Sequence, residues 1–106
     1  MIQAGVGDPS DAIATPALVI DLEAMERNLA AMAGFAHAHG VRLRPHAKMH
    51  KSAAIAQLQI AAGAVGVCVQ KLSEAEALAR AGIGDIYISN QVIEPLKLAQ
   101  IGRAHV

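Results

Sequence analysis

The segment from residue 44 to residue 51 contains five basic or titratable side chains around one proline, in a protein with no net charge. In an extended segment, where side chains alternate between faces, Arg44, His46 and Lys48 share one face, and Pro45 limits ladder pairing. An amine among cations is biased toward its neutral form, because neighbouring positive charge disfavours the ammonium. Since a neutral lysine is a nucleophile, Lys48 is a candidate for covalent chemistry with a carbonyl compound. The alternative interpretation of this segment is a solvated basic loop.

The composition limits the kinds of partner that these residues could bind. The 106 residues are 54% apolar and 17% charged, with nine Lys and Arg against nine Asp and Glu, so the charge favours neither nucleic acid nor an anionic membrane. Aromatic residues are 2% of the chain, too few to stack on single-stranded nucleic acid. No apolar run approaches the length that spans a bilayer, and the lone Cys68 excludes an internal disulfide. We therefore expect a small-molecule substrate and a cytoplasmic location, with no nucleic acid and no membrane partner.

Short apolar runs alternate with segments of helical period along the chain. We expect strands over residues 17–20, 41–47, 65–69 and 85–89. Helices are predicted from the N-cap Asp21 to Gly40, over residues 52–62, from a capping box at residues 73–76 to Gly82, and from Pro95 onward. The first helix carries an apolar stripe that we expect in the core, made of Leu22, Met25, Leu29, Met32 and Ala36.

This alternation predicts an α/β fold with parallel strands, because consecutive parallel strands need a crossover connection. No strand is followed by the Gly-x-Gly-x-x-Gly turn of a dinucleotide fold, so an incomplete (β/α)8 TIM-barrel fragment is the favoured architecture. In such a barrel the functional side chains lie where strands end. Polar residues follow three successive strands, at residues 46–48, 70–71 and 89–90, which favours a site that contains Lys48.

A family resemblance is carried by four segments: residues 15–22 (TPALVIDL), 43–51 (LRPHAKMHK), 70–76 (QKLSEAE) and 88–90 (ISN). Together they resemble the D-threonine aldolase and D-serine dehydratase-like family, whose members share the alanine racemase N-terminal domain type of pyridoxal 5′-phosphate (PLP) fold, fold type III. The resemblance implies that Lys48 is the catalytic lysine that joins covalently to PLP, in agreement with the electrostatic argument. It also suggests that His46 and Gln70 bind the cofactor, with His46 tuning the amine or touching the ring.

The remaining polar residues near Lys48 have simpler interpretations. A metal site shared by His46 and His50 is the weaker alternative, and no metal ligand is predicted within the chain. We expect Ser52 to cap the following helix and Cys68 to be a small buried residue.

Family members are much longer than this chain: they close an eight-stranded barrel, add a β-rich second domain and hold a divalent metal through ligands near the carboxyl end. The resemblance therefore implies the N-terminal fragment of a PLP-dependent D-threonine aldolase-like enzyme, which cleaves β-hydroxy-D-amino acids to glycine and an aldehyde. We expect the full-length parent to be a homodimeric lyase, and this fragment, which lacks the metal ligands, to be inactive alone. The alternatives are a D-serine dehydratase, an amino-acid racemase of the same fold and a non-catalytic PLP-binding homeostasis protein.

Three parts of the chain are expected. Residues 1–14 are predicted to be a flexible leader, and residues 15–100 the N-terminal part of a PLP-binding β/α barrel domain. Residues 101–106 have the sequence that a common sequencing adapter encodes in one reading frame, so we interpret them as a non-native tail. In the family the strand over residues 17–20 alternatively joins the sheet of the second domain, which would leave it unpaired here.

Overall fold

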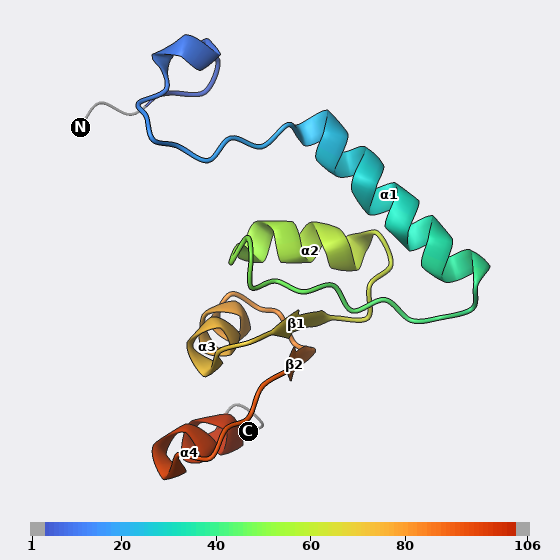
Figure 1. Ribbon diagram of the computed structural model, residues 1–106, viewed down its shortest axis with the longest axis vertical. Helices are drawn as coiled ribbons and strands as arrows, with labels where there is room; N and C mark the ends of the chain where they lie inside the picture. The colour runs from blue at the N-terminus through green and yellow to red at the C-terminus, as the bar shows by residue number, and fades with distance from the viewer. Residues whose placement is uncertain (1–3, 104–106) are drawn as a thin grey trace.

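The computed structural model describes residues 4–103, and its helices alternate with two short strands (Figure 1). In chain order the elements are the 3-10 helix η1 (Ser10–Ala12), α1 (Leu22–Ala38), α2 (Ala53–Ala61), β1 (Val67–Val69), α3 (Leu72–Arg80), β2 (Ile86–Ile88) and α4 (Pro95–Arg103). β1 and β2 pair in parallel, and α3 connects them and packs against both strands. The predicted α/β class with parallel strands is confirmed.

The predicted strand over residues 41–47 lies beside β1 but is reduced to one parallel bridge, between His46 and Cys68. The N–H of Cys68 donates to the carbonyl of Pro45 (2.9 Å), and the N–H of Ala47 donates to the carbonyl of Cys68 (2.7 Å). The preceding bridge would need an N–H donor at position 45, which proline lacks. The segment is therefore extended and parallel to β1, but its regular pairing with β1 is limited to the bridge at His46.

The core lies between the strands and the helices that follow them. Its buried residues are Ala47, Ala56, Val67, Val69, Leu72, Ala75, Leu78 and Ile83. Among residues 4–103 the largest fully buried side chains are two valines of β1, Val67 and Val69. α3 contributes the apolar face formed by Leu72, Ala75 and Leu78, all of which are buried.

The predicted starts of two helices are confirmed by side-chain caps. The carboxylate of Asp21 accepts the N–H of Ala24 at 3.1 Å, at the start of α1. The hydroxyl of Ser52 accepts the N–H of Ile55 at 3.2 Å and begins α2, which is the capping role expected for it. Within residues 4–103, no helix has both the length and the apolar character that a membrane crossing requires.

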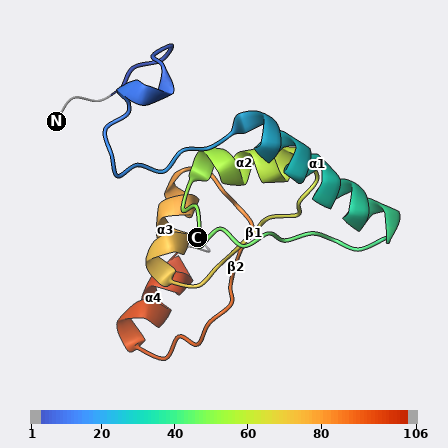
Figure 2. The same cartoon turned by 45° about the horizontal axis from the view of Figure 1, so that its top comes forward.

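The segment before α1 extends away from the other elements in both views (Figures 1 and 2). Residues 17–20 are not a strand: Leu18 is 100% exposed, and no strand within residues 4–103 lies beside it. The strand prediction is therefore wrong here, as the alternative assignment expects, because an extended segment becomes a strand only beside a partner. η1 lies in the predicted leader, whose flexibility stays a prediction. Residues 1–3 and 104–106 of the predicted leader and tail lie outside the described residues, while α4 extends into the predicted tail.

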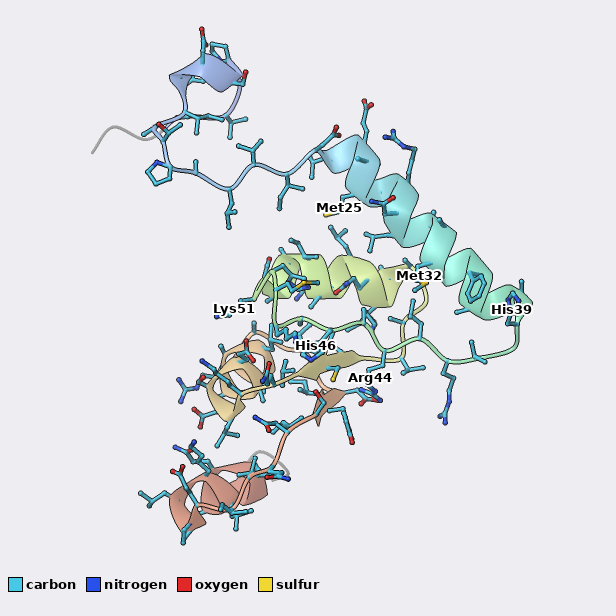
Figure 3. The ribbon with its side chains drawn as sticks, in the orientation of Figure 1. Met25, Met32, His39, Arg44, His46 and Lys51 are labelled. Atoms are coloured by element: carbon cyan, nitrogen blue, oxygen red, sulfur yellow. The ribbon has the colours of Figure 1, made fainter. Side chains whose placement is uncertain are left out.

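The apolar stripe of α1 is less buried than predicted. Ala36 is buried, whereas Leu22 is 61% exposed and Met32 is 53% exposed. The stripe instead lines an open groove of about 520 Å³ between α1 and α2, to which Met25 and Met32 both contribute (Figure 3). A periodic stripe predicts which face of a helix is apolar, but burial needs a second surface. The radius of gyration is 16.6 Å, above the value of about 13 Å for a compact chain of this length.

Candidate active site

The three parallel segments end at the same edge of the sheet. The register runs through His46 and Cys68 and continues into β2. The first segment leaves the sheet after Ala47, β1 ends at Val69 and β2 ends at Ile88. Lys48, Gln70 and Ser89 follow these ends directly and lie at one edge, because the carboxyl ends of parallel strands lie at one edge of a sheet. The three polar strand ends seen in the sequence therefore face a common edge.

Side-chain alternation divides the sheet into a packed face and an open face. Ala47, Val67 and Val69 lie on the packed face and belong to the core. The alternate positions form the open face, where side chains are half-buried or exposed: His46, Cys68, Gln70, Tyr87 and Ser89. The predicted cofactor-binding side chains His46 and Gln70 therefore belong to the face that the helices do not cover.

His46 and Ser89 contact each other across β1. The Nε2 atom of His46 lies 3.3 Å from the Oγ of Ser89, and the Ser89 hydroxyl donates to the carbonyl of Val69 at 3.3 Å. The Nδ1 atom of His46 accepts the backbone N–H of Lys48 at 3.2 Å. His46, labelled in Figure 3, therefore links the backbone of Lys48 to the end of β2.

Lys48 lies in a tight turn directly after the bridge to β1. The turn is anchored by Ala47, which is 1% exposed and whose carbonyl accepts the N–H of Lys51 at 2.9 Å. Lys51 has φ of 53°, a left-handed conformation that is uncommon for a residue with a Cβ atom. The Lys48 side chain is exposed, and its amine has no hydrogen-bond or ion-pair partner among residues 4–103.

His50 is held on the other side of this turn. Its Nδ1 accepts the N–H of Ser52 at 2.9 Å, and its Nε2 lies 3.2 Å from the side-chain oxygen of Gln59 on α2. Since His46 and His50 have separate partners, the structure does not pair them as metal ligands. Among residues 4–103, no group of three or more His, Cys, Asp or Glu side chains is gathered as a metal site would require.

The start of α3 differs from the prediction. Glu74 accepts the N–H of Lys71 at 2.8 Å and that of Gln70 at 3.2 Å, so the helix begins after Lys71. The capping box predicted at Ser73 is wrong by two residues, because a carboxylate in the first turn reaches back to N–H groups before the helix. Burial raises the pKa of Glu74, but these hydrogen bonds and the charges of Lys51 and Lys71 outweigh it, and the pKa lies below its ordinary value.

Gln70 and Cys68 are both on the open face of β1. Gln70 is exposed and follows β1 at the edge where Lys48 leaves the sheet, but no hydrogen bond joins its side chain to Lys48 or His46 in the described part of the chain. Cys68 is half-buried, which corrects the expectation of a buried residue, because no helix within residues 4–103 covers the face on which it lies.

Arg44 crosses β1 at the opposite edge of the sheet. Its Nη1 lies 2.7 Å from the Oδ1 of Asp85 and donates to the carbonyls of Val67 (3.3 Å) and Asp85 (3.4 Å). The hydrogen bond from Arg44 lowers the pKa of Asp85; burial opposes this, and the charges of Arg44 and Arg42 add to it. Arg44 shares the face of His46 as predicted, but its charge is paired with Asp85.

Residue types and spacing do not identify Asp85 or Ser89 as site residues. The sequence shows Ser89 only as a polar residue after a strand, and 43 positions separate it from His46. Their contact depends on the register across β1, which no local pattern contains. The sequence does contain a signal for Asp85. It is an acidic residue at the start of the expected strand over residues 85–89, and the basic Arg44 lies in the expected strand over residues 41–47.

Comparison with known proteins places this arrangement in a family. Residues 20–106 match the model of the alanine racemase N-terminal domain. The chain belongs to this family. A D-threonine aldolase from Arthrobacter sp is 54% identical over 97 residues, which cover 92% of this chain and 26% of that relative. D-threo-3-hydroxyaspartate dehydratase from Delftia sp. (strain HT23) is 54% identical over 72 residues, 68% of this chain and 19% of the relative.

The fold agrees with a solved member of the group. The crystal structure of D-threonine aldolase from Filomicrobium marinum superposes with a TM-score of 0.94 at 51% identity, and covers 98% of this chain and 28% of that one. As a member of the alanine racemase N-terminal domain family, the chain spans about a quarter of the length of the relatives that it matches.

Alanine racemase-fold aldolases imply PLP as the cofactor, and the residues present fit it. The cofactor carries an aldehyde and needs a free primary amine, and the Lys48 amine is exposed and has no partner in residues 4–103. The exposed Gln70 amide lies at the same sheet edge, where it could meet a polar group of the cofactor. No comparable fit exists among the described residues for a metal ion.

Proposed function

We propose that the protein provides the lysine-bearing part of a PLP-dependent enzyme that cleaves β-hydroxy-D-amino acids to glycine and an aldehyde. The observation that carries this proposal is the unpartnered amine of Lys48 at the carboxyl edge of a parallel sheet, in a chain 54% identical to a D-threonine aldolase. Both relatives described above are named for a β-hydroxy-D-amino acid, which supports the substrate class.

The proposal assigns roles to three residues. Lys48 binds the aldehyde of the cofactor covalently, Gln70 donates or accepts a hydrogen bond to the cofactor or substrate, and His46 lies beside Lys48 and orients it. The bound cofactor would withdraw electrons from the α-carbon of the substrate. The chain's own contribution is to hold an exposed amine in a turn at the carboxyl edge of the sheet.

We further propose that residues 15–100 form the first part of a β/α barrel. The spatial order of residues 41–47, β1 and β2 supports this, since each parallel neighbour is the next segment in the chain. The divalent metal implied by the family resemblance would have its ligands outside residues 4–103. The open groove along α1 also fits a chain that has further surfaces to cover.

A dehydratase is the second candidate, favoured by the 54% identity with the Delftia enzyme. An aldolase breaks the bond between the α- and β-carbons, whereas a dehydratase removes the β-hydroxyl and yields a 2-oxo acid and ammonia. Since both relatives match this chain, the part that they share does not determine which bond is broken.

Covalent labelling tests the role of Lys48 in the 106-residue chain itself. The protein is incubated with PLP, reduced with borohydride and digested, and the labelled peptide is identified by mass spectrometry. We expect a label at Lys48 and its loss in Lys48→Ala, with the label retained in Lys97→Ala, an exposed lysine on α4. A label spread evenly over all lysines, or none at all, would contradict the proposal.

A chimaera tests the reaction. This chain replaces the matching 28% of the Filomicrobium D-threonine aldolase, and the products from D-threonine and D-threo-3-hydroxyaspartate are identified. Glycine and an aldehyde support the aldolase, whereas a 2-oxo acid supports the dehydratase. Racemised substrate, or a label at Lys48 without turnover in a folded chimaera, would overturn both the aldolase and the dehydratase proposals. Lys48→Ala should abolish turnover and Lys97→Ala should not.

A further inference from the structure

The contact between Ser89 and His46 joins two segments that are 43 positions apart in the sequence. We propose that Ser89 is a positioning residue for Lys48, which acts through the imidazole of His46. This inference rests on the proposed function of Lys48, but the hydrogen-bond chain behind it is a property of the protein without cofactor.

The hydrogen bonds determine the tautomer of His46. A backbone N–H can only donate, so the Nδ1 atom that accepts from Lys48 at 3.2 Å carries no proton. In the neutral ring the proton is then on Nε2, which donates to the Oγ of Ser89 at 3.3 Å. The Ser89 hydroxyl in turn donates to the carbonyl of Val69 at 3.3 Å. Each group in this chain has a donor and an acceptor role that agrees with its neighbours.

The hydrogen-bond chain connects all three parallel segments at the edge that carries Lys48. Ser89 follows β2, its acceptor Val69 belongs to β1, and His46 forms the bridge beside β1. Because both ring nitrogens of His46 already have partners, His46 acts on Lys48 through the backbone N–H at position 48. Loss of the Ser89 hydroxyl removes the acceptor for Nε2–H, so the ring gains freedom to rotate or to change tautomer.

His50 provides an internal control for this arrangement. Its Nδ1 accepts the N–H of Ser52 and its Nε2 lies 3.2 Å from the Gln59 side chain, so it forms an equivalent pair of contacts that does not involve Ser89. A change that loosens the whole fold would affect both histidines. A change specific to the Ser89 contact would affect His46 alone.

Nitrogen-15 NMR of the imidazole rings in the cofactor-free protein tests the inference. We expect His46 of the wild type to be the Nε2–H tautomer. Ser89→Ala should give a mixture of His46 tautomers, and Ser89→Thr should keep the wild-type signals. The His50 signals should be the same in all three proteins. Ser73→Ala, at an exposed serine of α3, is the matched control and should change neither ring. A wild-type spectrum of the Nδ1–H tautomer, or identical His46 signals in Ser89→Ala and the wild type, would overturn the inference.

The rate of borohydride-trapped labelling of Lys48 by PLP gives the second readout. Ser89→Ala should lower this rate by a factor of about 2–10, the range that one lost hydrogen bond supports, and Ser89→Thr should recover it. An unchanged rate in a folded Ser89→Ala protein would refute the positioning role. If the His46 signals respond as expected but Lys48 is never labelled in the wild type, the proposed function fails and the hydrogen-bond chain stands.

Discussion

The guanidinium of Arg44 and the carboxylate of Asp85 lie 2.7 Å apart across β1. This ion pair joins the starts of the outer two parallel segments, and the His46–Ser89 contact joins their ends. Both contacts pass over the open face of β1, which pairs with a segment on each side. The turn that contains Lys48 is therefore attached to a sheet whose outer segments are joined by side-chain contacts at both edges.

Gly66 should not tolerate a side chain, because the Arg44–Asp85 pair passes directly over it. A Cβ atom at position 66 would overlap the carbonyl oxygen of Asp85 and approach the Arg44 guanidinium. We expect Gly66→Ala to lower the free energy of unfolding by at least about 1–3 kcal/mol, the usual cost of overpacking. Urea unfolding followed by circular dichroism measures the change.

Gly34 supplies the control for that substitution. It lies inside α1, and a Cβ atom there would meet nothing within 4 Å. Gly34→Ala should raise the free energy of unfolding by about 0.5–1 kcal/mol, because alanine loses less backbone freedom in a helix. If both substitutions raised the free energy of unfolding, the close approach of the Arg44–Asp85 pair to Gly66 would be wrong.

The Arg44–Asp85 pair predicts a loss of stability in acid. The hydrogen bond from Arg44 holds the pKa of Asp85 below its ordinary value of 3.8, so the carboxylate contributes stability that is fully present above that value and is lost as pH falls through the folded-state pKa. Asp85→Asn should be less stable than the wild type at pH 7, with a difference that narrows below about pH 4. Thermal unfolding from pH 7 to pH 2 measures this, and Glu26→Gln, which replaces an exposed carboxylate of α1, is the matched substitution.

The local structure was more predictable from sequence than the contacts across the sheet. Asp21 marks the start of α1 because a carboxylate before an apolar stripe satisfies free N–H groups, and Pro95 marks the start of α4 for a similarly local reason. The strand over residues 41–47 was predicted from composition, but whether its ladder forms depends on a partner and on the missing N–H of Pro45. Burial of the α1 stripe likewise depends on a surface that the helix itself does not specify.

Glu74 should be important for the start of α3, since its carboxylate accepts two backbone N–H groups. Glu74→Ala should lower the free energy of unfolding by about 0.5–2 kcal/mol, as loss of a helix cap does. Glu74→Gln keeps an oxygen acceptor and should lose less. Equal losses in the two variants, measured by urea unfolding, would mean that charge rather than hydrogen bonding stabilises this end of the helix.

Lys51 should accept glycine better than alanine, because its φ of 53° is left-handed. Either substitution removes the lysine charge near Glu74, so the comparison between them isolates the backbone conformation. Lys51→Gly should be more stable than Lys51→Ala by about 1 kcal/mol, since only glycine adopts this conformation without a steric penalty. A more stable Lys51→Ala, measured by thermal unfolding, would show that the turn relaxes to another conformation.

The sequence predicts which edge of the sheet carries the candidate site, but not which hydrogen bonds form there. Lys48, Gln70 and Ser89 follow three successive strands, and a parallel register alone brings such residues together. The tautomer of His46 depends on the backbone N–H of Lys48 and on the Ser89 hydroxyl. Those positions follow from the turn and the strand spacing, which a pattern of residue types does not determine.

The alternation between packed and open faces restricts how this sheet can change length. Val67 and Val69 belong to the core, and Cys68 and Gln70 to the open face. Deleting or inserting one residue within β1 would exchange these two sets, so that valines faced the site and polar groups entered the core. Natural variants of this sequence should therefore differ in length within the connections, by any number of residues, and keep the lengths of the strands unchanged.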